Sequence, residues 1–403
     1  MESETRAPEI RFEGFTDPWE QRKLGDLVLI ERGGSPRPID AYITEGPAGL
    51  NWVKIGDAPS MGRYITSTSE KIKPEGLSKT RQVYPGDLVL SNSMSFGRPY
   101  IMAVEGCIHD GWLLIRDAQN QFDPVFLCHM LGTSQMLEQY RMFASGSTVN
   151  NLNKELVGNA TVPVPNRNEQ VEIGKYLDEL DNLITLHQRK YDKLCVVKKS
   201  MLDKMFPKPG ALYPEIRFEG FTDPWEQRKL GEFGSVAMCK RIYKEQTSEQ
   251  GDVPFFKIGT FGADPDAFIS NELFDYFKRT YPYPTPGTLL ISAAGSIGRV
   301  VEYQGEKAYF QDSNIVWLEH DHRLNDTFLK PLYSQIEWGL EGSTIKRLYN
   351  KDLLSAEVTI PGSREQKEIG RFFAKLDDLI TLHQRKLELL KNVKKSLLEK
   401  MFV

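Results

Sequence analysis

The stretch PEIRFEGFTDPWEQRKLG occupies residues 8–25 and returns without a change at residues 214–231. A second repeat, ITLHQRK, stands at residues 184–190 and again at residues 380–386. Chance does not produce an identity of 18 residues, so the chain is a tandem duplication. Between the matching borders the interiors have diverged widely. The pattern predicts one frame, built twice, that holds two different middles.

The two copies span about 8–206 and about 214–402 of the 403 residues, and each is long enough to bury a core. The 40% hydrophobic and 26% charged residues are typical of a soluble globular protein. No stretch approaches the ~18–20 apolar residues of a membrane span, and the N-terminus has no signal-peptide pattern. The cysteines (Cys107, Cys128, Cys195 and Cys239) form no CxxC pair, which predicts free thiols and a cytoplasmic location.

The net charge of −4 gives no overall indication of nucleic-acid binding, so any such contact must come from local patches. Residues 184–206 hold six Lys or Arg against two Asp, and residues 380–403 hold six against two Glu. Such runs are also typical of solvated helix faces, and charge alone leaves both interpretations open.

The interiors favour an α+β fold with two globular domains, because short β-type runs are broken by Gly and Pro. The repeated segment predicts an extended lead-in with a turn or short helix at residues 19–24. Helical stretches are predicted at 124–143 and 326–341. The predicted strands lie at residues 83–91, 101–104, 111–115, 286–292, 299–303 and 314–318.

Each copy ends in a long predicted helix of about 35 residues, roughly 50 Å at 1.5 Å per residue. Asn168 and Ser363 are the predicted N-caps, and Ser363 with Gln366 fits a capping box. Apolar residues alternate spacings of four and three over four heptads, which is typical of a coiled coil. The predicted seam comprises Ile173, Leu177, Leu180, Ile184, His187 and Leu194 in the first helix and Ile369, Phe373, Leu376, Ile380, His383 and Leu390 in the second.

Both seams are polar at equivalent places, His187 with His383 and Lys198 with Lys394, and polar seam residues can fix the register of a pair. Prolines after residue 205 end the first helix. We expect the two helices to pair antiparallel, which would relate the halves by a pseudo-two-fold axis. A metal site formed by His187 and His383 is the alternative; we interpret both as seam residues and predict no metal.

Six segments follow from these borders. They are an N-terminal repeated segment (1–25), a first globular domain (26–165), a central long helix (166–206), a linker with the second repeated segment (207–231), a second globular domain (232–361) and a C-terminal long helix (362–403).

Motifs for catalysis are absent from the sequence. It holds no GxxxxGK[ST] phosphate loop, no HExxH zinc site and no Asn- or Asp-Pro-Pro-aromatic tetrapeptide of adenine methylation. We therefore predict no catalytic residues and no cofactor bound by this chain.

Matching segments in the two interiors give the candidate contact residues. Either they are strand and turn framework common to two copies, or they touch nucleic acid through hydroxyls, amides and basic groups. Both interpretations stay open. The candidates are Lys54, Ser91, Asn92, Ser93, Arg98, Ser147, Thr148, Asn150 and Asn151 in the first domain, and Lys257, Ser292, Ser296, Arg299, Ser343, Thr344, Lys346 and Arg347 in the second.

Over essentially its whole length the chain resembles the specificity (S) subunit of a Type I restriction–modification system. Two diverged domains are each followed by a long helix that opens with Glu-Gln. The motifs that carry the resemblance are Glu169-Gln170 and Glu365-Gln366, the helix core at 180–190 and 376–386, the Lys-Met-Phe endings, and the Pro-containing segments before the helices at 162–165 and 358–361.

The resemblance implies two target recognition domains, each reading one half of a split, asymmetric site on double-stranded DNA. It implies that the paired helices set the half-site spacing and dock two methyltransferase subunits, which use S-adenosylmethionine to methylate adenine N6. Two motor–nuclease restriction subunits, which need ATP and Mg²⁺, would complete the complex. The specificity subunit itself would have no chemistry.

Two other functions stay open. The chain could be a self-contained DNA methyltransferase or nuclease, against which the missing cofactor motifs argue. It could also be a tandem-repeat scaffold that binds only proteins. Cofactor binding by the purified chain would identify the first, and absence of sequence-specific DNA binding with a methyltransferase partner would identify the second.

Overall fold

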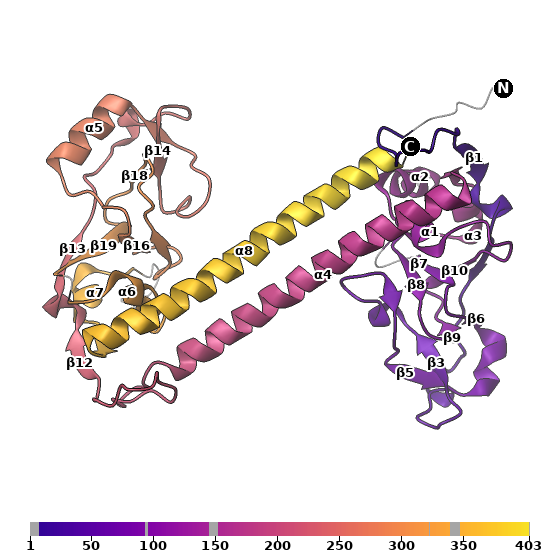
Figure 1. The fold of residues 1–403 in the computed structure, drawn as a ribbon, viewed down its shortest axis with the longest axis horizontal. Coiled ribbons are helices and arrows are strands. Elements are labelled where there is room, and N and C mark those ends of the chain that lie inside the picture. Colours follow the sequence, from indigo (N-terminus) through magenta and orange to yellow (C-terminus); the bar gives the residue numbers. More distant parts are fainter. Residues whose placement is uncertain (1–7, 93–95, 145–151, 322, 339–346, 403) are drawn as a thin grey trace. The chain divides into compact units, whose positions relative to one another are not determined.

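The computed structural model describes residues 8–92, 96–144, 152–321, 323–338 and 347–402. The chain divides into two compact units, residues 1–190 with 383–403 and residues 191–382. Each unit therefore combines one globular domain with a half of each long helix (Figure 1). The predicted α+β fold, with two domains and two long antiparallel helices, is confirmed.

The first domain is built on two sheets. The larger sheet has the strand order β2-β10-β7-β8-β4 and the smaller has the order β5-β3-β9-β6. Buried aliphatic and aromatic side chains fill both, as β-branched and aromatic residues favour strands. The strands are β2 (Leu29–Arg32), β3 (Leu50–Val53), β4 (Tyr64–Ile65), β5 (Glu70–Ile72), β6 (Arg81–Val83), β7 (Leu88–Ser91), β8 (Pro99–Met102), β9 (Gly106–Ile108) and β10 (Trp112–Arg116).

The second domain repeats the central part of this plan. Its four-stranded sheet has the order β13-β19-β16-β17, which matches β2-β10-β7-β8, and its three-stranded sheet has the order β15-β14-β18. The shared order explains why matching sequence segments occur in both interiors. The strands are β13 (Gly234–Ala237), β14 (Val253–Phe256), β15 (Phe268–Ile269), β16 (Leu289–Ser292), β17 (Val300–Glu302), β18 (Tyr309–Phe310) and β19 (Ile315–His320).

Short helices complete the domains and correct two predictions. Gly132 breaks the predicted helix 124–143 into two, and α6 is shorter than predicted. The helix α5 has no counterpart in the first domain and was not predicted. The helices are α1 (Pro124–Leu131), α2 (Ser134–Ala144), α3 (Lys154–Gly158), α5 (Asn271–Thr280), α6 (Asp326–Tyr333) and α7 (Asn350–Ser355).

The repeated segment forms a strand where a turn or short helix was predicted. β1 (Glu20–Lys23) pairs antiparallel with β11 (Thr161–Val164), and β12 (Glu226–Lys229) pairs in the same way with β20 (Glu357–Ile360). The prediction failed because the partner strand lies about 140 residues away in sequence, while the segment alone shows no apolar alternation. Only a 3₁₀ turn, at Leu24–Asp26, follows the strand.

The long helix α4 (Arg167–Lys204) begins one residue before its predicted N-cap, and α8 (Ser363–Met401) begins at the predicted N-cap residue itself. Asn166, not Asn168, caps α4, because its side-chain oxygen accepts the Glu169 amide at 3.0 Å. Ser363 lies inside α8, and the Gln366 side chain donates to the Pro361 carbonyl at 3.0 Å instead of closing a capping box. Both N-cap predictions were therefore wrong by one or two residues.

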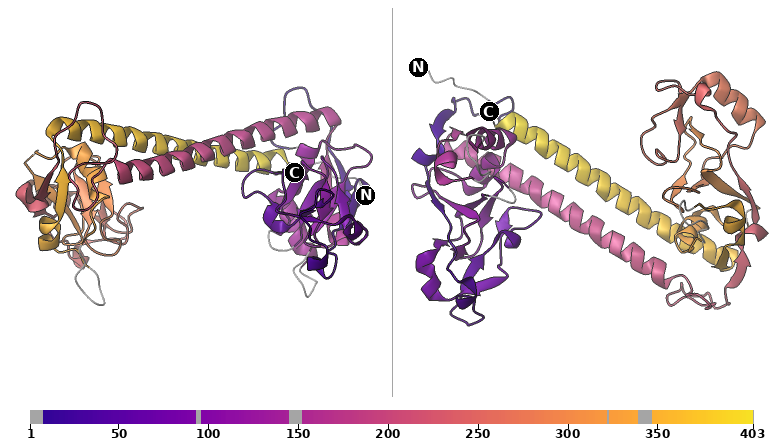
Figure 2. Two further views of the ribbon diagram at one scale, coloured as in Figure 1. Left: turned by 90° about the horizontal axis from the view of Figure 1, so that it is seen from below. Right: turned by 180° about the vertical axis from the view of Figure 1, so that it is seen from behind.

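The helix halves pair antiparallel inside each unit (Figures 1 and 2). In the first unit, Asp181 binds Lys394, and the His187 Nδ1 atom lies 2.8 Å from the His383 Nδ1 atom. From the first contact to the second, the residue number increases along α4 and decreases along α8, which defines an antiparallel pair. In the second unit, Lys198 binds Asp377. The two ion pairs are equivalent, because Asp181 corresponds to Asp377 and Lys394 to Lys198 in the repeat, and the two histidines correspond to each other.

The predicted seam residues differ in what they pack against. Ile173 and Leu177 lie in the core of the first domain, whereas Leu180 and Ile184 pack on Leu387 of the other helix. In the second unit, Ile369, Phe373 and Leu376 lie in the domain core with Leu194 beside them. Ile380, His383 and Leu390 are half-buried. Each helix thus packs into a domain core at its N-terminal end and on the other helix farther along.

Candidate nucleic-acid interface

A short turn before one central strand organises each domain. In the first domain it comprises residues 109–111 and precedes β10; in the second it comprises residues 312–314 and precedes β19. We call these the lead-in turns. Because β10 pairs antiparallel with β7 and β19 with β16, each turn lies at the sheet end where β7 or β16 finishes.

In the first domain, the predicted contact residue Asn92 lies against the lead-in turn. The backbone amide of Asn92 donates to the Gly111 carbonyl at 3.0 Å, and its side-chain amide donates to the Asp110 carbonyl at 2.8 Å. The Asn92 carbonyl in turn accepts the Leu152 amide at 3.0 Å. Leu152 directly follows Asn151, the last predicted contact residue of this domain.

The second domain repeats this arrangement with different residues. The Ala293 amide donates to the Asn314 carbonyl at 2.7 Å, and the Ala293 carbonyl accepts the Leu348 amide at 2.9 Å. Arg347, a predicted contact residue, donates a terminal amino group to the Ser313 carbonyl at 3.0 Å. The framework of the loops is therefore shared, while the side chains on it differ.

The segments around the two predicted lysines reach the same turns. The His109 amide donates to the Val53 carbonyl at 3.1 Å, and the Gln311 amide donates to the Phe256 carbonyl at 3.0 Å. Lys54 itself binds Glu70 at 2.5 Å, and Lys257 binds Asp266 at 2.8 Å. Both lysine side chains are half-exposed, and each ammonium group is paired with a carboxylate. The carboxylate partly neutralises the ammonium charge and so weakens its attraction for a phosphate.

The predicted serine and asparagine residues divide between framework and surface. Ser91, Asn92 and Ser292 are buried, and the Ser91 and Ser292 hydroxyls accept the Arg98 and Arg299 amides at 3.1 and 3.0 Å. Burial and these bonds favour the framework interpretation for all three. Ser296, by contrast, is exposed.

Arg98 and Arg299 occupy equivalent exposed positions after these turns. Arg98 donates a terminal amino group to the Ser60 carbonyl at 3.0 Å, and Arg299 donates one to the Gly262 carbonyl at 3.0 Å. A guanidinium has five N–H donors, so each arginine keeps donors for a phosphate or a base. Their contact with DNA stays a prediction.

Eight predicted contact residues lie outside the described residues. They are Ser93, Ser147, Thr148, Asn150, Asn151, Ser343, Thr344 and Lys346.

A fourth segment, which the sequence pattern did not predict, lies at the end of β2 or just after β13 and also reaches the lead-in turn. In the first domain, Arg32 donates its Nε to the Asp110 carbonyl at 3.2 Å and Arg37 lies 3.9 Å from the Asp110 carboxylate. In the second, Arg241 donates its Nε to the Asp312 carboxylate at 2.8 Å, and this bond raises the pKa of Arg241. The segments share no sequence pattern, so comparison of the two copies could not reveal them.

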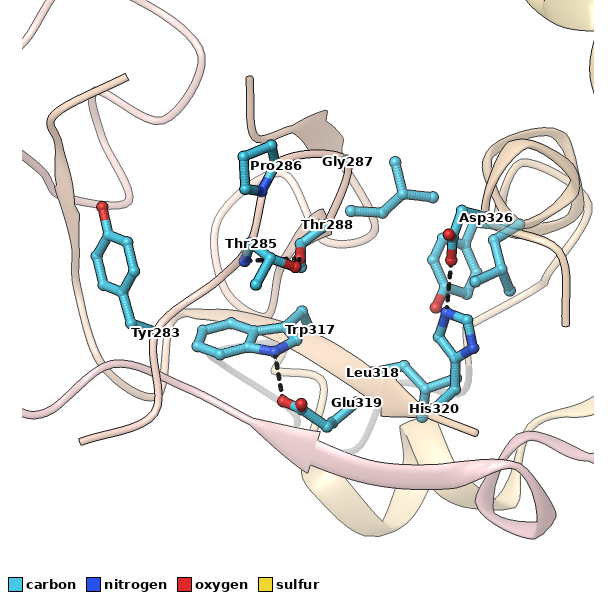
Figure 3. Close-up of a pocket in the computed structure, with 13 residues that line it drawn as sticks. Tyr283, Thr285, Pro286, Gly287, Thr288, Trp317, Leu318, Glu319, His320 and Asp326 are labelled. Carbon is cyan, nitrogen blue, oxygen red and sulfur yellow. Dashed lines mark hydrogen bonds and ion pairs between the residues drawn. The ribbon is translucent and has the colours of Figure 1, made fainter. Parts of the chain in front are cut away.

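A cavity of about 280 Å³ in the second domain lies at the opposite end of β19 (Figure 3). Its polar groups are paired with one another: the Trp317 indole donates to Glu319 at 3.1 Å, and His320 lies 2.9 Å from Asp326. Because it holds neither a lead-in turn nor a predicted contact residue, it is not part of the candidate interface.

Two domains with one central sheet order, each with four polar segments at a lead-in turn and each followed by a long helix, define a duplicated two-domain binding protein. The model of the "Type I restriction modification DNA specificity domain" matches residues 16–195 and 222–392. The chain belongs to this family and contains two copies of its domain.

Relatives and solved structures agree with the family. A provisionally named type I restriction enzyme specificity subunit of Haemophilus influenzae is 38% identical over 256 residues, which cover 63% of this chain and 64% of that protein. The match thus spans less than two thirds of that relative. The MjaVIII specificity subunit of Methanocaldococcus jannaschii is 20% identical over 95% of this chain and 91% of its own length.

The crystal structure of the S subunit of a Type I restriction–modification system from M. genitalium has a TM-score of 0.66, with 16% identity over 99% of both chains. At this identity the likeness concerns the fold. No helix among the described residues is long and apolar enough to cross a bilayer.

Proposed function

We propose that this chain is the DNA-specificity subunit of a Type I restriction–modification complex. Each domain reads one half of a split, asymmetric site, and the chain has no catalytic step of its own. The observation that carries the proposal is the pair of lead-in turns: in both domains one backbone arrangement gathers the described residues of four segments, and their side chains differ. Two readers with one framework suit two unlike half-sites.

Phosphate contacts would hold each domain on the duplex, while side chains at base edges would supply the sequence preference. The exposed arginines at equivalent positions, Arg98 and Arg299, suit the first role because both domains need it. The residues that differ between the lead-in turns suit the second.

Two methyltransferase subunits would dock on the long helices. Leu183 and Leu186 lie three residues apart on one helix face and are 45% and 46% exposed. Their equivalents, Leu379 and Leu382, are 43% and 45% exposed. One exposed apolar pair in each copy supports one partner for each copy, hence two methyltransferase subunits.

Leu183→Glu and Leu379→Glu test this docking. Each single variant should lose one methyltransferase subunit from the purified complex, measured by native mass spectrometry, and the double variant should lose both. Asn182→Glu, at an exposed residue of the same helix turn outside the apolar pair, is the control. Full complexes with both variants would contradict the assignment.

The remaining chemistry belongs to the partner subunits. The methyltransferase subunits would bind S-adenosylmethionine, and two motor–nuclease subunits would bind ATP and Mg²⁺. The four unpaired cysteines, three of them buried, support work in a reducing cytoplasm.

A map of N6-methyladenine in DNA from cells that carry this chain and its methyltransferase tests the function. We expect one split motif with methylated adenines on opposite strands. Replacement of residues 26–165 by the matching segment of another family member should change one half-site and leave the other. If both half-sites change together, the domains are not separate readers.

A further inference from the structure

Arg241 lies near the second lead-in turn, and its Nε atom donates a hydrogen bond to a carboxylate of that turn. Among the described residues, no other arginine near this turn is anchored in this way. The Nε–Oδ2 distance to Asp312 is 2.8 Å, and Asp312 is 14% exposed, so the anchor is largely inside the domain. The Arg241 side chain is 58% exposed. One end of the guanidinium is fixed and the other faces solvent.

This geometry leaves the donor fork of Arg241 available. Within the described part of the chain, neither terminal amino group of Arg241 has a hydrogen-bond partner. Arginine recognises guanine through two donors directed at O6 and N7, and this fork is the commonest specific contact to a base in the major groove. An anchor at Nε orients the fork before binding and so reduces the entropy lost on contact.

The turn that carries Asp312 is held in place by hydrogen bonds to other segments of the domain. Ser313 has a positive φ of 59°, a conformation uncommon for residues other than Gly and found often at functional sites. The Ser313 carbonyl accepts Arg347, and the Asn314 carbonyl accepts the Ala293 amide at 2.7 Å. The Asp312 anchor therefore lies among the segments expected to meet DNA.

The first domain lacks this arrangement. There Asp110 accepts the Ser35 hydroxyl at 3.1 Å, and Arg37 approaches Asp110 only with a terminal amino group, at 3.9 Å. Arg37 is 83% exposed and is not anchored at Nε. In the first domain the Arg32 Nε is held only by the Asp110 backbone carbonyl, at 3.2 Å. An arginine anchored at Nε by a carboxylate of the lead-in turn is thus a feature of the second domain, as a residue that distinguishes the two half-sites should be.

We propose that Arg241, held by Asp312, reads a guanine in the half-site of the second domain. The inference rests on the proposed function. Asp312 acts as a positioning residue, since its carboxylate sets the plane of the guanidinium without touching the base.

The test is the methylation map of the complete complex with Arg241→Ala, Arg241→Lys, Asp312→Asn or no substitution. The unsubstituted complex should show a guanine in one half-site. Arg241→Ala should relax the preference at that base pair by about 5- to 150-fold and leave the other half-site unchanged. Arg241→Lys should relax the same position because lysine lacks the planar fork, and Asp312→Asn should relax it less.

The control is Arg323→Ala. Arg323 is also held at Nε by a carboxylate, Asp321, at 2.8 Å, but it follows the opposite end of β19. This variant should keep the full motif.

Three results would overturn the inference: an unchanged motif with both Arg241 variants, a change in the other half-site, or equal weakening at all positions with a smaller salt dependence, which indicates a phosphate contact. If Arg241→Ala abolishes methylation, the Arg241→Lys motif decides. Absence of a split motif from the unsubstituted complex would instead refute the proposed function.

Discussion

Glu169 and Glu365 explain why each long helix opens with the same two residues. Glu169 is buried and accepts both Nε and a terminal amino group of Arg11 at 2.8 Å, and Glu365 binds Arg217 in the same way at 2.7 Å. The next residue, Gln170, accepts the Asp123 amide at 2.9 Å. The repeated segment and the helix start are therefore one polar joint in each copy.

Arg11→Ala should destabilise the first unit by about 3–5 kcal/mol, because it leaves the Glu169 carboxylate buried without its cation. Chemical denaturation followed by tryptophan fluorescence measures the loss. Arg22→Ala removes a surface pair with Glu20, in which the side chains are 47% and 71% exposed, and should cost below about 1 kcal/mol. Equal effects of the two variants would show that the joint is not a buried pair.

Lys394 gives the first unit a pH dependence. Burial, with Arg63 close by, lowers the pKa of Lys394 from 10.5 to about 8. The unfolded chain then holds a proton between pH 8 and 10.5 that the folded chain has released, so unfolding takes up a proton. The contribution of Lys394 to stability therefore rises with pH across this window.

Lys394→Met should remove that rise. Urea denaturation at pH 7.5 and pH 10 gives the change in free energy of unfolding for each protein, and the difference between them isolates Lys394. A variant with the same pH response as the parent would refute the lowered pKa.

Two glycines in the long helices let these helices pack on their domains. Gly174 of α4 lies against the start of α1, where the Asp123 carboxylate accepts the Val125 and Phe126 amides at 3.0 and 2.9 Å. A Cβ atom at position 174 would lie 2.6 Å from that carboxylate. Gly370 of α8 has the equivalent place against α6. Close approach of two helices, not flexibility, requires glycine here.

Gly174→Ala should destabilise the first unit by about 1–3 kcal/mol. Displacement of the Asp123 cap and overpacking outweigh the ~1 kcal/mol that alanine gains over glycine in a helix. Thermal unfolding measures the change. Gly56→Ala, where a Cβ atom meets nothing within 4 Å, is the control and should have little effect. A stabilised Gly174→Ala protein would show that the helices can separate at no cost.

Each unit takes its core from both copies of the sequence. Met401 and Phe402 lie in the core of the first domain beside Trp19 and Phe126, with ring centroids 6.4 and 5.4 Å from Phe402. Phe206 lies in the core of the second domain, with its ring 5.8 Å from Trp225. The Lys-Met-Phe endings are thus core elements, and each repeated tryptophan packs on one of them.

Phe402→Ala should destabilise the first unit by about 3–5 kcal/mol and leave the second unchanged, because the deleted ring is buried only in the first. Hydrogen exchange resolved by segment should show faster exchange at residues 8–190 and unchanged exchange at 214–361. Phe206→Ala should give the reverse pattern. If either variant affects both units equally, the cores are not independent.

Sequence comparison found the elements whose pattern is local or repeated. Heptad spacing predicted α4 and α8 because a helix face repeats within a few residues. The β1 strand was missed because its partner, β11, is distant in sequence. Arg241 was missed because the two copies differ there, so comparison within the chain gives no signal at the positions that distinguish the domains.

Apolar periodicity and repetition in the chain specified two copies of one α+β frame, each with a long helix. They could not assign Asn92 to the framework or Arg241 to the surface. That assignment depends on hydrogen bonds between segments 18 to 71 residues apart, such as Asn92 to Asp110 and Arg241 to Asp312. Distance along the chain does not encode such proximity, so only the folded structure reveals which polar groups are already satisfied and which remain available to a partner.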